Sequence, residues 1–181
     1  MRSPSCTQLS PYQKITLLYS ASEKVAKEIP LVCDAARMCD IEVQQLMVQT
    51  LSELYTASQA IAPDSHAVFV LKDHLIVSGI QSVVQQAHLR HIPVMTSDEG
   101  SVIAGAAFAL GVKEASIGVQ GGLIAKAILE GQPPQSIAPQ TLNGPFSLFV
   151  NRRTCERQGI DVSLLRAKAE AEGLTLCFVG N

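Results

Sequence analysis

Polar side chains gather at three points of the sequence, each directly after an apolar run. The runs are Lys14–Tyr19, Ala67–Leu71 and Ile92–Thr96. The three groups together contain hydroxyls, a cation, an imidazole and carboxylates: Ser20, Ser22, Glu23, Lys72, Asp73, His74, Ser97, Asp98 and Glu99. Side chains of these types, together with helix N-terminal amides, suit a zwitterion or another small polar solute. We therefore treat these nine residues as candidate ligand-binding residues.

The same groups have a second interpretation as helix caps. Ser22, Asp73 and Ser97 are of types that accept hydrogen bonds from first-turn amides. For any single group capping is the favoured interpretation, whereas three groups on one sheet edge favour a binding face. The two roles are compatible, because a side chain can cap a helix while neighbouring amides face a ligand.

Catalytic chemistry has less support. Asp98 and Glu99 are neighbours in sequence, so their carboxylates point apart and do not form an acid–base pair. His74 has no nucleophile motif to accompany it. Gly118–Gly122 matches neither a P-loop nor a dinucleotide fingerprint, and the five cysteines include no C-x-x-C pair. We expect no catalytic residue, no metal ligand and no cofactor, with a small α/β enzyme as the weakest of three functional hypotheses.

Composition limits the class of protein. The chain has 181 residues, 47% of them hydrophobic and 17% charged, which fits one folded domain. The net charge is -2 and no basic run exceeds Arg152-Arg153, so a nucleic-acid partner is not expected. No apolar stretch is long enough to cross a bilayer. The first residues lack the apolar core of a secretion signal, so the chain as given is expected to be cytoplasmic if expressed alone.

Hydrophobic periodicity predicts alternating strands and helices after a polar tail, residues 1–13. The expected strands are Lys14–Tyr19, Ile41–Val48, Ala67–Leu71, Ile92–Thr96 and Phe146–Val150. The expected helices follow the apolar spacings of Val25–Ala36, Leu51–Ile61, Ile76–Ala87, Ile117–Ile128 and Ser163–Glu172. Pro30 must kink the first helix or start its second segment.

This alternation predicts an α/β fold, a doubly wound parallel sheet with helices on both faces. Ligands of such sheets bind at the carboxyl ends of the strands, where the three polar groups would lie. Ile103–Val112 is Ala-rich and is compatible with helix or strand. Residues 132–181 fit the alternation poorly, because the strand at 146–150 has no obvious place in a compact sheet.

Longer stretches resemble a known family. They are ITLLYSASE at 15–23, AVFVLKDH at 67–74, and IPVMTSDEGSVIAGAAFALGV followed by a Gly- and Pro-terminated helix at 92–140. From about residue 14 to 165 the chain resembles the C-terminal lobe of a type I periplasmic binding protein. The closest branch looks like the amino-acid-binding ABC transporter substrate-binding proteins. Phe146–Ile160 is similar to the strand and helix that cross back towards the first lobe.

The resemblance implies a solute-binding component of an ABC importer for an amino acid or similar solute, in the periplasm or cell envelope. Its partners would be that small ligand and an ABC permease. The alternative is a cytoplasmic small-molecule-sensing or protein-interaction module derived from such a lobe. The family more often has a Thr-Asp-Asn-like turn where this chain has Lys72-Asp73-His74, which leaves the ligand open.

The resemblance also implies a division of the chain. Residues 14–145 would form the ligand-binding lobe, and 146–181 would be a cross-over strand and C-terminal helices that pack on a missing first lobe. Phe146, Leu148 and Val150 are then expected to lack cover in the chain alone. Residues 145–172 would therefore be its least stable part, or the interface of a homodimer.

Overall fold

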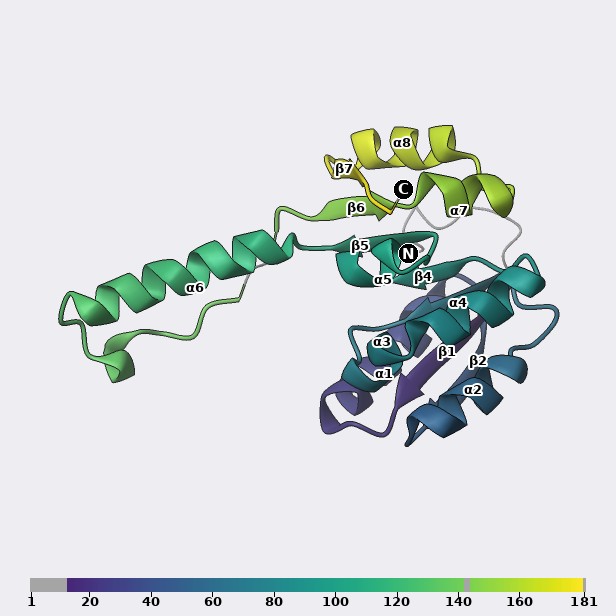
Figure 1. Ribbon diagram of the computed structural model, residues 1–181, viewed down its shortest axis with the longest axis horizontal. Helices are drawn as coiled ribbons and strands as arrows, with labels where there is room; N and C mark the ends of the chain where they lie inside the picture. The colour runs from purple at the N-terminus through teal and green to yellow at the C-terminus, as the bar shows by residue number, and fades with distance from the viewer. Residues whose placement is uncertain (1–12, 142–143, 181) are drawn as a thin grey trace.

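The computed structural model describes residues 13–141 and 144–180, which form one seven-stranded sheet with helices on both faces (Figure 1). The strand order is β2-β1-β3-β4-β5-β6-β7. The strands are β1 (Lys14–Ser20), β2 (Glu42–Val48), β3 (Ala67–Val70), β4 (Val94–Thr96), β5 (Phe108–Gly111), β6 (Ser147–Val150) and β7 (Thr175–Phe178). The first five are parallel, β6 is antiparallel to β5, and β7 is parallel to β6. The expected α/β class is confirmed, with one antiparallel pair in the sheet.

The five helices expected from periodicity are present, although the one expected over Ile76–Ala87 is divided into two, and a short helix at Glu99–Ile103 was not expected. The helices of the structure are α1 (Glu23–Met38), α2 (Leu51–Gln59), α3 (His74–Ser78), α4 (Ile80–Leu89), α5 (Glu99–Ile103), α6 (Glu114–Leu129), η1 (Pro134–Ser136), α7 (Arg152–Arg157) and α8 (Val162–Ala171). The helix α1 runs through Pro30 as one element. The ambiguous run 103–112 contains the last residue of α5 and the strand β5. Among the described helices, none is long and apolar enough to cross a membrane.

Alternating side chains of the strands build two apolar layers. Leu18 of β1 faces the larger core, which α2, α3, α4 and α5 cover through residues such as Leu54, Ile76 and Val83. Leu17 points to the other face and packs with Val25 of α1. Further along that face, α7 and α8 cover β6 and β7. The central strands β1, β3 and β4 are therefore largely covered on both faces, as their apolar sequences require, whereas the edge strands β2 and β7 keep exposed residues.

The C-terminal strands continue this same sheet. In β6, Leu148 and Val150 are 7% and 0% exposed, and Phe149 on the opposite face is 0% exposed. The expectation that this strand has no place in a single sheet is therefore wrong. The antiparallel pairing that accommodates it leaves no signal in the hydrophobic pattern. Phe146 keeps 44% exposure, and packing of residues 146–181 on another lobe stays a prediction.

The part that does leave the body is α6. It extends away from the sheet as a long arm, and the chain returns beside it through η1 (Figure 1). None of its residues is buried. We call Glu114–Ala138 the α6 arm. Leu148 and Val150, which were expected to lack cover, are thus buried, and the exposed arm lies before residue 145.

Candidate functional site

The three predicted polar groups lie on one edge of the sheet, because β1, β3 and β4 are parallel neighbours. The groups follow the carboxyl ends of these strands at Ser20, Val70 and Thr96. Between β1 and β3 the strand order also reverses direction, since β2 lies on the outer side of β1. Open α/β sheets bind ligands at such a switch point. The shared edge is confirmed, and the contribution of each residue to ligand binding stays a prediction.

Asp73 holds the first two groups together. Its Oδ2 accepts a hydrogen bond of 2.6 Å from the backbone N–H of Ser20, and its Oδ1 accepts one of 3.1 Å from the N–H of Leu75. The side chain is 2% exposed. Both carboxylate oxygens are thus engaged inside the protein, and Asp73 caps α3 while joining the ends of β1 and β3.

Two further members of the groups are also caps. The Asp98 carboxylate accepts hydrogen bonds of 2.8 Å from both the backbone N–H and the hydroxyl of Ser101. The Ser22 hydroxyl accepts a hydrogen bond of 3.3 Å from the N–H of Val25. Asp98 is 5% exposed. The capping interpretation therefore holds for one residue in each group, although at Asp98 rather than Ser97 in the third.

The remaining candidates keep polar atoms available. Among the described residues, no hydrogen bond or ion pair engages the side chains of Ser20, Glu23, His74, Ser97 or Glu99. The Ser97 Oγ is buried with no partner in that part of the chain. Glu23 and His74 are exposed, and Glu99 is half-buried. The edge thus combines fixed caps with free hydroxyls, carboxylates and an imidazole.

Among the described residues, Lys72 is the one candidate that forms an ion pair, and its partner lies outside the three groups. Its Nζ lies 2.8 Å from Oε1 of Glu114, in the first turn of α6. Glu114 was missed by the sequence analysis because the position of β5 was left open there. An acidic residue directly after a short apolar strand is the signal that could have found it. The ion pair links the candidate site to the base of the α6 arm.

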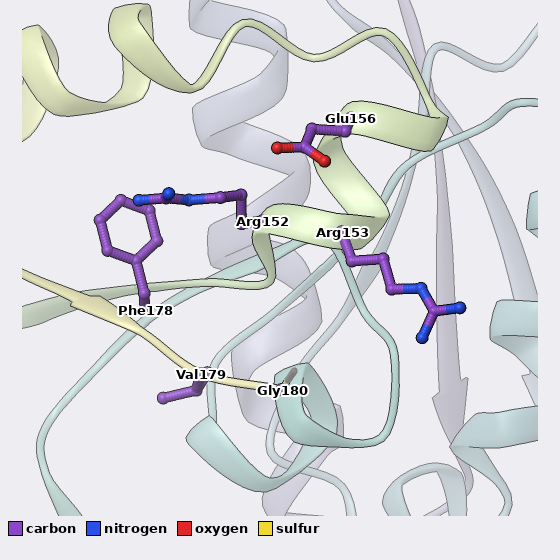
Figure 2. Close-up of a pocket in the computed structure, with 6 residues that line it drawn as sticks. All are labelled: Arg152, Arg153, Glu156, Phe178, Val179 and Gly180. Atoms are coloured by element: carbon purple, nitrogen blue, oxygen red, sulfur yellow. The ribbon is translucent and has the colours of Figure 1, made fainter.

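A separate hollow of about 310 Å³ lies at the other edge of the sheet (Figure 2). It is lined by Arg152, Arg153, Glu156, Phe178, Val179 and Gly180. The Arg152 guanidinium stacks on the Phe178 ring at 4.4 Å, whereas Arg153 points away from it. Because β6 is antiparallel, its carboxyl end lies opposite those of β1, β3 and β4. The hollow contains none of the nine candidates.

The described part of the chain has no cluster of potential metal ligands, and one of its cysteines is fully buried. Within residues 13–141 and 144–180, no three His, Cys, Asp or Glu side chains are close enough to share a metal ion. Cys155 is fully buried, and this burial raises the pKa of its thiol to about 11. A thiol with such a pKa is protonated at neutral pH and is a poor nucleophile.

Curated relatives extend well beyond the length of this chain. A protein of Rickettsia prowazekii is 43% identical over 148 residues, which are 82% of this chain and 48% of that protein. The tyrosine-binding protein of Clostridioides difficile is 31% identical over 156 residues, 86% of this chain and 44% of that protein. The chain therefore spans about half the length of the curated relatives it matches.

Solved structures share the fold. The ABC domain of a Streptococcus pneumoniae protein, determined in complex with L-Trp, superposes with a TM-score of 0.75 at 22% identity. The match covers 85% of this chain and 54% of that one. The family model for ABC transporter substrate-binding proteins matches residues 7–170. That family consists of binding proteins rather than enzymes. The chain belongs to the ABC transporter substrate-binding protein family.

Proposed function

We propose that this chain is an amino-acid-binding lobe of a solute receptor that delivers its ligand to an ABC permease on the outer side of a membrane. The observation that carries the proposal is the carboxyl edge of β1, β3 and β4, where buried caps leave a second set of polar groups free. The relative that binds tyrosine and the solved complex with L-Trp support an aromatic amino acid as the ligand.

The free groups match the two charges of an amino acid. The Glu99 carboxylate is half-buried and unpaired among the described residues, so it suits the ligand's ammonium group. The ligand's carboxylate suits the Ser20 and Ser97 hydroxyls and the N-terminal amides of α1, a helix of 16 residues with its positive dipole end at this edge. Glu23 and His74 are exposed and would form the rim.

The caps have a different task in this proposal. Asp73 ties the end of β1 to the start of α3, and Asp98 fixes the first turn of α5. These buried hydrogen bonds hold the loops in one arrangement, so the ligand does not have to order them on binding. Asp73 and Asp98 thus act on affinity through the backbone that they position.

One lobe is a shallow receptor. A small-ligand site normally encloses about 70–90% of its ligand, and an open sheet edge does not. Loss of roughly 4 kcal/mol relative to a two-lobed receptor that binds at about 1 μM moves the dissociation constant to about 1 mM. We expect the isolated chain to bind aromatic amino acids at about 1 mM or weaker.

Titration of the isotope-labelled chain with L-tryptophan, L-phenylalanine and glucose tests the proposal by NMR. The two amino acids should shift the amide signals of residues 20–23 and 97–99 with saturation in the millimolar range, and glucose should not. Glu99→Gln should weaken binding by roughly tenfold, since one charge-assisted hydrogen bond contributes about 1.5 kcal/mol or more. Glu156→Gln, at the hollow on the opposite edge, is the matched control. Equal shifts with glucose, or no shift with either amino acid, would refute amino-acid binding at this edge.

A further inference from the structure

The hollow beside α7 is separate from every group that the proposed function uses. Its volume of about 310 Å³ lies near the lower end of the range for small-ligand pockets, about 300–1,000 Å³. One wall is α7, and the other is the end of β7 with the residues after it. The family match covers residues 7–170, so this second wall lies beyond it. Binding of an amino acid at the opposite edge therefore does not account for the hollow.

Arginine side chains gather around the hollow. Arg152 and Arg153 line it, and Arg166 of α8 approaches the ring of Phe178 from the neighbouring helix. The guanidinium carbon of Arg152 lies 4.4 Å from the centre of that ring (Figure 2), and that of Arg166 lies 5.9 Å from it. One exposed aromatic ring thus holds two cations in the same place.

Stacking leaves the hydrogen-bond donors of these groups available. The face of a ring attracts a guanidinium, whereas the five N–H donors lie in the plane of the guanidinium itself. Among the described residues, no hydrogen bond or ion pair engages Arg152, Arg153 or Arg166. Neighbouring cations repel each other, and an anion between them removes that repulsion.

The two walls are held in place by Asn151, the residue before α7. Its Nδ2 donates a hydrogen bond of 3.0 Å to the carbonyl oxygen of Val102, and its Oδ1 accepts one of 3.0 Å from the N–H of Thr154. Gly180 packs directly on this amide, because a Cβ there would lie 2.5 Å from Nδ2. The backbone around the hollow is therefore ordered before a ligand arrives, which lowers the cost of binding.

The charge of the hollow favours an anion. Among the described residues that line it, Glu156 is the only acid, against the two cations Arg152 and Arg153. Glu156 follows Arg152 by four residues on α7, yet no ion pair joins them. The carboxylate thus lowers the positive potential without neutralising it.

The number of free donors indicates which kind of anion fits. A carboxylate or a phosphate diester has two free oxygens and one charge, which the fork of a single guanidinium satisfies. A phosphate monoester has three free oxygens and a charge of about −1.5 to −2. We propose that the hollow binds a phosphate monoester, with Arg152 as its main contact and a second arginine completing its coordination. Both soluble phosphate esters and the head group of phosphatidic acid carry this group. The proposal does not depend on amino-acid binding at the other edge.

An NMR titration of the isotope-labelled chain with glycerol 3-phosphate tests this at constant ionic strength and pH 8, where the monoester carries its second charge. The amide signals of residues 152–156 and 178–180 should shift with saturation, and those of residues 20–23 and 97–99 should not. Acetate and dimethyl phosphate should bind about tenfold more weakly, because each lacks one charge-assisted hydrogen bond.

Variants separate specific recognition from general electrostatics. Arg152→Gln should weaken binding of glycerol 3-phosphate by about tenfold or more, and Arg152→Lys should recover only part of the loss, because lysine keeps the charge without the fork. Glu156→Gln should strengthen binding by about two- to fivefold, a gain that unfolding cannot produce. Arg157→Gln, on the same helix but outside the hollow, is the matched control and should change the affinity by less than about twofold.

Sedimentation with phosphatidylcholine vesicles distinguishes the two sources of the monoester. Vesicles that contain phosphatidic acid present it on a surface, and vesicles of equal surface charge that contain phosphatidylglycerol present a diester. Binding to the first alone, lost in Arg152→Gln, would identify the lipid, whereas binding of glycerol 3-phosphate without vesicle binding would identify a soluble ester.

Four outcomes would overturn the proposal. They are no saturable shift around the hollow up to about 10 mM glycerol 3-phosphate, equal affinity for acetate, equal binding to both kinds of anionic vesicle, and equal weakening by Arg152→Gln and Arg157→Gln. The first would mean that Arg152 only covers the ring of Phe178. Circular dichroism of each variant checks that the chain is folded, and the gain expected of Glu156→Gln keeps the test valid should Arg152→Gln unfold.

Discussion

Two helices of equal length, α1 and α6, have opposite surroundings. Both span 16 residues and both start at the carboxyl edge of the sheet. The helix α1 contains Pro30 and many charged residues, yet it buries Val25, Ile29 and Ala36 against the sheet. The helix α6 is richer in aliphatic residues and buries none. The apolar stripe of α1 thus lies against the sheet, whereas α6 leaves its aliphatic side chains exposed.

The largest effect separates matched isoleucines in these two helices. Ile29→Ala removes a side chain that is 8% exposed, and we expect unfolding to become easier by about 2–4 kcal/mol through lost transfer energy and an incompletely closed cavity. Ile117→Ala, at 45% exposure, should change the free energy of unfolding by about 0.5 kcal/mol or less. Urea denaturation of both variants measures the difference. Similar losses at the two positions would mean that α6 packs on the body.

A carboxylate comparison gives the next effect. Asp73→Ala leaves the buried N–H of Ser20 and the start of α3 without an acceptor, and should cost about 2–3 kcal/mol. Asp34→Ala breaks only the exposed ion pair with Arg37 on α1 and should cost about 0.5 kcal/mol or less. Urea denaturation measures both free energies, and near-equal costs would show that Asp73 does not hold the edge together.

Glycine-to-alanine substitutions should change stability in opposite directions in the sheet and in α6. A Cβ at Gly111, the last residue of β5, would lie 2.7 Å from the carbonyl oxygen of Ser97, so Gly111→Ala should destabilise by about 1–3 kcal/mol. A Cβ at Gly121 in α6 would meet nothing within 4 Å, so Gly121→Ala should favour the helix by roughly 0.5–1 kcal/mol. Urea denaturation reports the first change and far-ultraviolet circular dichroism the second. A destabilising Gly121→Ala would show that α6 packs closely against other atoms at this position.

The smallest expected change in stability concerns α7, a short helix that packs against the sheet through Cys155. Burial raises the pKa of the Cys155 thiol to about 11, above the value of an unfolded thiol. The resulting stabilisation is fully present below the unfolded pKa, near 9, and is lost as pH rises through 11. Urea denaturation at pH 8 and pH 10.5 measures the free energy of unfolding. Between these pH values it should fall more for the unmodified chain than for Cys155→Ala. Equal losses would mean that α7 opens readily, as we expect of the α6 arm.

Much of the sheet could be predicted from the hydrophobic pattern of the sequence. Parallel strands such as Ala67–Val70 are short apolar runs, and helices such as α4 have a single apolar stripe, so both leave a periodic signal. The run 103–112 was ambiguous because Ala-rich segments satisfy either period. The strand β7 was missed, since Thr175–Phe178 is short and only half-buried.

The site was predictable only to the level of residue groups. Polar residues after apolar strands located the correct edge, because all carboxyl ends of parallel strands share it. The sequence did not separate caps from free groups, since Asp73 and Glu99 have the same carboxylate chemistry. Their difference is burial and geometry: Asp73 is 2% exposed and accepts three backbone hydrogen bonds, whereas Glu99 is half-buried and has no partner among the described residues. Tertiary contacts therefore decide which carboxylate is a buried cap and which keeps its oxygens available.

The pairing between β5 and β6 has a consequence for protein design. Gly111 and Ser147 lie directly opposite each other in the antiparallel ladder, although 35 positions separate them in the chain. The segment between Gly111 and Ser147 therefore leaves the sheet and returns to it at neighbouring positions. An insertion whose two ends lie side by side can be replaced, because a turn of a few residues can join the same two antiparallel strands. Exchanging the whole segment between homologues would therefore leave the register of the sheet that carries it unchanged.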